Sequence, residues 1–108
     1  MTKDADTMIC CLYKEYLERV KIGSPKKDSR KFKPEYFSSN LPFSNWHSSD
    51  VDMTKSELVH LSYLKADIIG NISFTDDGIS YMENRFKNNF KELCECISKL
   101  TNLVSYTV

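Results

Sequence analysis

The chain has 108 residues, which is the usual size of a single domain. Hydrophobic residues make up 41% of it, with only three glycines and three prolines, so the composition favours a packed core over disorder. No window approaches the roughly 18 consecutive apolar residues of a membrane span, and the first residues lack the pattern of a secretory signal. We therefore expect a cytoplasmic chain, 1–108, that forms one domain and has no membrane partner.

Charge is balanced overall but unevenly distributed along the chain. Fifteen basic and fifteen acidic residues cancel, whereas the segment 21–33 holds six basic residues and one acidic residue, a local net charge of +5. Residues 34–108 hold six basic and ten acidic residues, a net charge of −4. A segment polarised in this way favours an anionic partner.

The four cysteines fall in two close pairs, Cys10 with Cys11 and Cys94 with Cys96. Structural zinc usually takes cysteines separated by two to four residues, and neither pair has that spacing. On a helix, Cys94 and Cys96 would point about 200° apart. We expect free thiols, no metal site with His47 or His60, and no cofactor.

The first predicted helix covers residues 5–21. Its apolar residues recur at helical spacing, and Gly23 follows as a stop signal. The stripe consists of Ile9, Leu12, Tyr13, Tyr16, Leu17 and Val20.

A short basic helix is predicted next, from Pro25 to about Phe32, because Ser24-Pro25 has the form of a helix start. The segment 33–49 is predicted to be mostly loop, since it contains two prolines and several serines. It also carries five large apolar residues, so it either packs back on the core or forms a binding surface: Tyr36, Phe37, Leu41, Phe43 and Trp46.

A third helix is predicted over residues 50–66, with Ser49 and Asp52 as a capping box. One face of it would hold Val51, Thr54, Leu58, Leu61 and either Leu64 or Lys65. The segment 67–75 then has two short β-prone runs on either side of Gly70-Asn71, which is a signal for a hairpin with a two-residue turn. The helices and hairpin together cover residues 5–75.

The last predicted helix is long and amphipathic, from residue 76 to 100, and begins after Thr75. Its stripe is Ile79, Met82, Phe86, Phe90, Leu93, Ile97 and Leu100. The stripe either covers the core or pairs with another subunit. A helix of 25 residues is about 37 Å long, more than so small a core can cover, so we expect a homodimer through Phe90, Leu93, Ile97 and Leu100. The tail is 101–108, and within it Leu103 to Val108 is apolar and β-prone, so it either forms a strand or is disordered.

The order helix, basic helix, loop, helix, hairpin, helix matches a winged helix-turn-helix, mainly α with a short β-hairpin wing. The segments 58–69 and 74–82 carry a family resemblance. Leu58-x-x-Leu61-x-x-Leu64, followed by a tight turn and Phe74-Thr75-Asp76-Asp77-Gly78-Ile79, is similar to small winged-helix proteins of bacteria and phages, the YjcQ-like proteins. The resemblance spans about residues 5–95, and its motifs are mostly structural. It implies a winged-helix fold and binding of double-stranded DNA, with transcription regulation as the expected role.

Under this resemblance, the helix 50–66 would enter the major groove and expose Thr54, Lys55, Ser56 and His60 to base edges. Phosphates would be contacted by Lys26, Lys27, Arg30 and Lys31. Asn71 would lie at the wing tip, near the minor groove or the backbone.

Two features weaken this interpretation. The segment between the second and third predicted helices is about seventeen residues, longer than the usual three or four. The predicted recognition helix carries Asp50, Asp52 and Glu57, which phosphates repel, and it lacks arginine, the commonest reader of guanine.

The alternative is a phage or mobile-element protein that binds a host protein, such as an anti-CRISPR or other anti-defence inhibitor. Its contacts would come from Tyr36, Phe37, Phe43 and Trp46, since aromatic residues are enriched at interface centres. The sequence has no phosphate loop, zinc-protease motif or nucleophile elbow, so we expect no enzyme activity and assign no catalytic residues.

Overall fold

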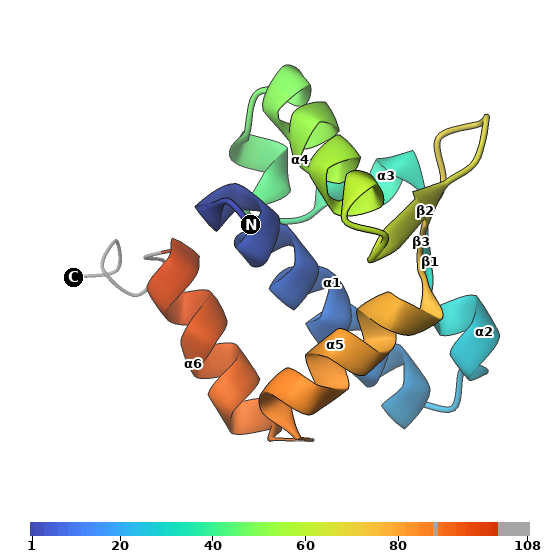
Figure 1. Ribbon diagram of the computed structural model, residues 1–108, viewed down its shortest axis with the longest axis vertical. Coiled ribbons are helices and arrows are strands. Elements are labelled where there is room, and N and C mark those ends of the chain that lie inside the picture. The colour runs from blue at the N-terminus through green and yellow to red at the C-terminus, as the bar shows by residue number, and fades with distance from the viewer. Residues whose placement is uncertain (88, 102–108) are drawn as a thin grey trace.

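The computed structural model describes residues 1–87 and 89–101 (Figure 1). In these ranges the chain is mainly helical with one small antiparallel sheet, as the sequence predicts at this coarse level. The elements are α1 (Lys3–Lys21), α2 (Lys26–Ser29), β1 (Lys31–Phe32), α3 (Pro34–Ser39), the short 3-10 helix η1 (Phe43–Asn45), α4 (Ser48–His60), β2 (Leu64–Ala66), β3 (Ile72–Phe74), α5 (Asp76–Phe86) and α6 (Phe90–Thr101). The predicted tail lies outside the described residues beyond Thr101.

The helix α1 runs through the middle of the molecule, where α4, α5 and α6 pack around it (Figure 1). It begins two residues before the predicted start, because the Thr2 hydroxyl accepts a hydrogen bond from the Ala5 N–H at 3.1 Å. Its predicted stripe faces the core, with Ile9, Leu12 and Tyr13 almost completely buried. The prediction of this helix is confirmed.

The sheet has the strand order β1-β3-β2, and both pairs are antiparallel. The strand β1 occupies the end of the predicted basic helix, so the prediction of a helix from Pro25 to Phe32 is wrong beyond Ser29. Arg19 holds this strand in place, because its guanidinium donates to the Lys31 carbonyl at 2.7 Å and lies 4.4 Å above the Phe32 ring. β1 then pairs with β3 through Lys31 opposite Ser73 and Phe32 opposite Ile72.

The predicted loop 33–49 is largely helical, which corrects the prediction. Pro34 is the first residue of α3, where its missing N–H costs nothing, and η1 follows after a further turn. Phe37 and Phe43 from these two elements are buried. The segment therefore forms part of the core.

The helix α4 covers residues 48–60 rather than 50–66. Its N-cap is His47, whose ring Nδ1 accepts from the Ser49 N–H at 3.1 Å, so the predicted Ser49 capping box is wrong. At the other end, Ser62 has a φ of 69°, and the chain turns there into β2. The residues from 64 to 66 are consequently extended, and Leu64 is buried opposite Phe74.

The hairpin strands are β2 and β3, and residues 67–71 form the connecting turn. The expected strand directly before Gly70-Asn71 is therefore wrong. Instead, Ile68 and Ile69 lie in the turn and are fully exposed or nearly so, at 103% and 74%. We call residues 67–71 the wing turn.

The predicted long helix 76–100 is two helices. Thr75 caps α5 as predicted, since its hydroxyl accepts from the Gly78 N–H at 2.9 Å. At Lys87 the backbone is left-handed, with φ 49°, and this residue ends α5. The next helix, α6, turns back along α1 (Figure 1).

Candidate functional site

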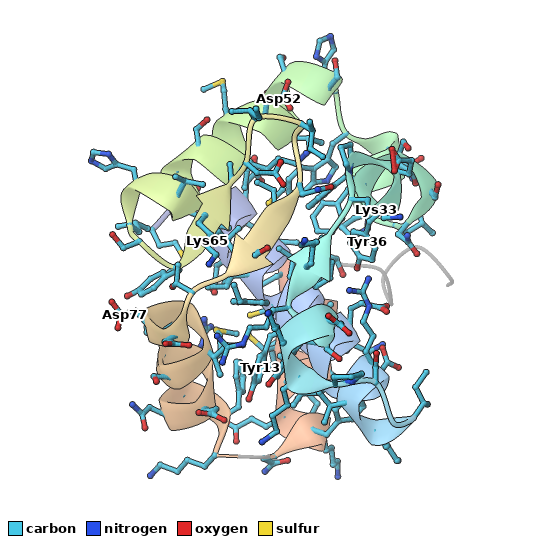
Figure 2. The ribbon with its side chains drawn as sticks, turned by 90° about the vertical axis from the view of Figure 1, so that its right-hand side faces the viewer. Tyr13, Lys33, Tyr36, Asp52, Lys65 and Asp77 are labelled. Carbon is cyan, nitrogen blue, oxygen red and sulfur yellow. The ribbon has the colours of Figure 1, made fainter. Side chains whose placement is uncertain are left out.

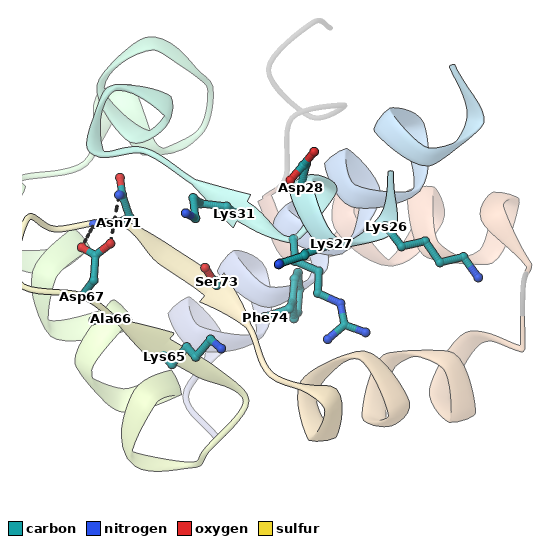
Figure 3. A pocket seen from close by; sticks show the side chains of 11 residues that line it. Lys26, Lys27, Asp28, Lys31, Lys65, Ala66, Asp67, Asn71, Ser73 and Phe74 are labelled. Atoms are coloured by element: carbon teal, nitrogen blue, oxygen red, sulfur yellow. Dashed lines mark hydrogen bonds between the residues drawn. The ribbon is translucent and has the colours of Figure 1, made fainter. Parts of the chain in front are cut away.

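Four of the six basic residues of the segment 21–33 gather beside the sheet in an open groove of about 490 Å³ (Figure 3). The charged side chains that line it are Lys26, Lys27, Asp28, Arg30, Lys31, Lys65 and Asp67. Five cations and two carboxylates leave a net charge of +3. We call this the lysine groove.

The floor of the groove is the outer face of the sheet, which faces the viewer in Figure 2. Lys31 and Lys65 both lie opposite Ser73, one from each neighbouring strand. Residues opposite one another in a sheet share a face, so Lys31, Ser73 and Lys65 form one row across it. The neighbouring positions Phe32, Leu64, Ile72 and Phe74 point the other way and are buried in the core.

Arg30 differs from the lysines because it is engaged within the chain. Its guanidinium donates a hydrogen bond to the Asp76 carboxylate at the start of α5. This contact raises the pKa of Arg30 and lowers the pKa of Asp76. The lysines Lys26, Lys27, Lys31 and Lys65 are exposed, and they are the cations best placed for an external anion.

The wing turn closes one end of the groove through Asp67 and Asn71 (Figure 3). The Asp67 carboxylate accepts from the N–H groups of Ile69 and Asn71 at 3.1 and 2.8 Å, and from the Asn71 side-chain amide at 3.0 Å. The desolvation of Asp67 is outweighed by these bonds and by nearby Lys31, so the pKa of Asp67 is lowered. Asn71 lies at the end of this turn, directly before β3, and its side-chain amide is used inside the turn.

The predicted base-reading residues of α4 do not join this groove. Thr54 is buried, and its hydroxyl donates to the Asp50 carbonyl at 2.7 Å, so the prediction that it is exposed is wrong. The Lys55 amino group lies 4.1 Å from the centre of the Phe37 ring, and partial burial lowers its pKa. Ser56 and His60 line a separate hollow between α4 and the wing turn.

The predicted protein-binding residues mostly fill the core. Phe37 and Phe43 are buried, with ring centres 5.4 Å apart. Tyr36 and Trp46 are half-buried and pack against the same group. Of these four residues, only Tyr36 and Trp46 keep part of their surface exposed to solvent.

The predicted dimer residues belong to α6, which packs on α1 of the same chain. Leu93 is completely buried, so it is unavailable to a second subunit. Ile97 and Leu100 are half-buried against the core, and Phe90 is 42% exposed. The length argument for a dimer fails because the helix is broken after Phe86.

Lys65 and Ser73 are groove residues that the sequence prediction missed. The sequence pattern places Lys65 in the predicted helix 50–66 and indicates no role for Ser73. The alternation Leu64-Lys65-Ala66 and Ile72-Ser73-Phe74 is a strand signal that would have placed both on the face opposite the core.

The four cysteines are free thiols, and burial raises the pKa of Cys11 to about 12. Among the described residues, no cluster of three or more His, Cys, Asp or Glu side chains has the geometry to hold a metal ion. No helix within residues 1–87 and 89–101 is both long and apolar enough to cross a membrane.

Comparison with known proteins found no matching family model, no matching curated protein and no matching solved structure.

Proposed function

We propose that this chain is a small winged-helix protein that binds double-stranded DNA through its lysine groove, with transcription regulation as the expected role. The topology supports the fold: helix α1, strand β1, helices α3 and α4, then the hairpin β2–β3, with β3 in the centre of the sheet. In this assignment α3 and α4 are the helix pair. They are separated by residues 40–47 instead of the seventeen residues that the sequence indicated.

The observation that carries the DNA proposal is the row Lys31, Ser73 and Lys65 across the outer sheet face. Adjacent strands are about 4.8 Å apart, so the two lysine backbones lie about 10 Å from each other. Like charges at this separation, which is close to the screening length of about 8–10 Å, repel each other weakly and do not stabilise the sheet. An anion with several phosphates removes this repulsion, and the serine hydroxyl between the lysines can donate to a phosphate oxygen.

The neighbouring lysines extend the same positive surface along one edge. Lys26 and Lys27 on α2 lie beside the row, and Asp28 is the only acidic residue of that helix (Figure 3). A long polyanion can therefore contact α2 and the sheet together. Affinity of this kind comes from phosphate contacts and the release of counterions, and it falls steeply with salt.

In this proposal α4 contributes less than a usual recognition helix. Asp50 and Asp52 are exposed on it. Glu57 is held by the Thr2 N–H and hydroxyl at 2.8 and 2.6 Å. We therefore expect binding that depends weakly on base sequence, because phosphate contacts carry no sequence information.

The test is a fluorescence anisotropy titration of a mixed-sequence duplex at about 50 and 200 mM salt, the range over which a few phosphate contacts change affinity by orders of magnitude. We expect Lys31→Gln with Lys65→Gln to weaken binding at low salt and to reduce the slope of log affinity against log salt by about 2. The matched control is Lys91→Gln with Lys99→Gln, two exposed lysines of α6.

The control removes the same charge from a helix that lies across the molecule from the groove (Figure 1). It should leave most of the affinity and the salt slope unchanged. An equal loss of affinity in both double variants would mean that binding depends on the net charge of the chain and not on the lysine groove. Absence of binding at the lower salt concentration would reject the proposed function.

A further inference from the structure

The wing turn presents two isoleucines to solvent at the end of the β2–β3 hairpin. Ile68 and Ile69 are exposed at 103% and 74%. Exposed single apolar residues are common, but two adjacent large ones at the tip of a protruding hairpin form an unpartnered apolar point. The hairpin extends away from the helices in Figure 1, so this point is accessible to a large partner.

The turn that carries the isoleucines is closed by its own hydrogen bonds. The Asp67 N–H donates to the Asn71 carbonyl at 3.1 Å, and the Gly70 N–H donates to the Asp67 carbonyl at 3.2 Å. The Asp67 carboxylate accepts three further bonds from Ile69 and Asn71. A turn ordered in this way before binding loses little conformational entropy when its tip is inserted into a partner.

The surroundings of the tip indicate what kind of partner it fits. The lysine groove lies on one side of the hairpin, with Lys65 near the turn. On the other side is the hollow that Asp52, Lys55, Ser56 and His60 line together with Gly70. A minor groove can take such a tip, because two rows of phosphates border it and an apolar side chain that reaches its floor can enter between stacked bases.

We propose that Ile68 and Ile69 form a wedge that enters the minor groove of the bound duplex and partly unstacks a base step. Apolar side chains at this position separate neighbouring bases, and the duplex kinks away from the protein. The lysine groove would hold the phosphate backbone on one side of the hairpin. On the other side, the charges of Asp52 and Lys55 cancel, and Ser56 and His60 would supply polar contacts. The inference rests on the proposed DNA binding and adds the deformation of the duplex to it.

The same tip would give sequence preference without hydrogen bonds to bases. Unstacking costs least at pyrimidine–purine steps such as TA and CA, and most within stiff A-tracts. We therefore expect the wedge to select flexible steps. This preference for flexible steps would give the chain some sequence selectivity, although α4 offers few contacts to bases.

The experiment uses duplexes with a single 2-aminopurine, whose fluorescence rises when it is unstacked, placed at a TA step or within an A-tract. Binding and fluorescence are measured on the same samples. We expect the full-length wild-type chain to raise the fluorescence several-fold at the TA step and less in the A-tract. End-labelled duplexes should report a bend of about 20–90° by energy transfer.

Ile68→Ser with Ile69→Ser should keep the salt slope of binding, lower the affinity several-fold, and lose the fluorescence rise and the bend. These residues are exposed, so the variant is expected to fold, and its circular dichroism verifies this. Ile22→Ser is the matched control, because Ile22 is 84% exposed just after α1, away from the hairpin. This control should keep the fluorescence rise.

The outcomes separate the two proposals. A duplex that binds with the expected salt slope but shows no fluorescence rise at the TA step overturns the wedge and leaves the DNA proposal intact. A rise that persists in the double Ile→Ser variant also overturns the wedge. Absence of any binding at about 50 mM salt, where even non-specific affinity is high, rejects the DNA proposal and the wedge with it.

Discussion

Asp76 connects the lysine groove to the start of α5 through its ion pair with Arg30. The contact joins the residue just before β1 to the first turn of a helix 46 positions further along the chain. A carboxylate at this point also interacts favourably with the helix N-terminus. The ion pair links α5 to the residue before β1, and its contribution to stability is small because the Asp76 side chain is 90% exposed.

The hydrogen bond from Arg30 holds the pKa of Asp76 below its ordinary value of 3.8. A group whose pKa is lowered by folding stabilises the folded state above its unfolded pKa, and this contribution is lost as the pH falls through the folded pKa. We expect Asp76→Asn to lower the free energy of unfolding at neutral pH. The difference from the wild type should narrow as the pH falls below about 4.

Urea denaturation at several pH values between about 3 and 7 measures this difference. The control is the same substitution in an Arg30→Gln background, where the partner cation is absent. In that background, Asp76→Asn should lower the free energy of unfolding by a smaller amount at neutral pH. The effects of the Asp76→Asn and Arg30→Gln substitutions should therefore not be additive. If the difference in unfolding free energy between the wild type and Asp76→Asn grows as the pH falls, the ion pair between Arg30 and Asp76 is contradicted.

At the scale of elements, the junction between α5 and α6 distinguishes the structure from the continuous helix that the sequence predicts. Lys87 ends α5 in a left-handed conformation, and its N–H donates to the Glu83 carbonyl at 2.7 Å. A residue with a Cβ is disfavoured in this conformation by about 1–2 kcal/mol, whereas glycine is not.

We therefore expect Lys87→Gly to stabilise the chain by about 0.5–1 kcal/mol, after allowance for the greater freedom of glycine in the unfolded state. In a continuous helix, Lys87→Gly would destabilise the chain by about 1 kcal/mol. The sign of the change in unfolding free energy therefore distinguishes a continuous helix from two separate helices. Glu95→Gly is the control, because Glu95 is exposed inside α6. It should destabilise by about 1 kcal/mol in a denaturation experiment.

The elements that the sequence predicted well are those with long local patterns. The stripe of α1 extends over several turns, and the start of α5 has a strong cap at Thr75. In contrast, β1 has two residues, and it exists because β3 pairs with it from about 40 positions away. Local signals in this segment favoured a helix, and the tertiary contact prevailed.

The candidate site was predicted in part for the same reason. Lys26, Lys27, Arg30 and Lys31 are close together in the chain, so their charge density was visible in the sequence. Lys65 joins them only through the register of the sheet. Thr54 lies on the same helical face as Val51 and Leu58, and this spacing already indicated a buried position.

At the scale of the whole molecule, a chain with no net charge carries a local excess of positive charge in the lysine groove. The lysine groove carries a net charge of +3, while the remaining surface is net acidic. Long-range attraction to a polyanion is therefore weak at a distance and strong only when the groove faces it. Such a distribution favours oriented binding over general adhesion to nucleic acid.

The packing of α6 decides whether the molecule needs a second copy to cover its apolar surface. Leu93 is completely buried between α6 and the rest of the chain. Leu93→Ala should therefore lower the free energy of unfolding by about 2–5 kcal/mol, as expected for a fully buried leucine. Leu61→Ala, at a leucine that is 39% exposed, should cost clearly less.

The measurement is urea denaturation at two protein concentrations about tenfold apart, since the stability of an obligate dimer depends on concentration. We expect the loss caused by Leu93→Ala to be the same at both, because the contacts that it removes lie within one chain. The contradicting result would be a urea midpoint that rises with protein concentration for the wild type but not for Leu93→Ala. That result would mean that Leu93 lies in a subunit interface. The intrachain packing of α6 on α1 predicts the opposite result.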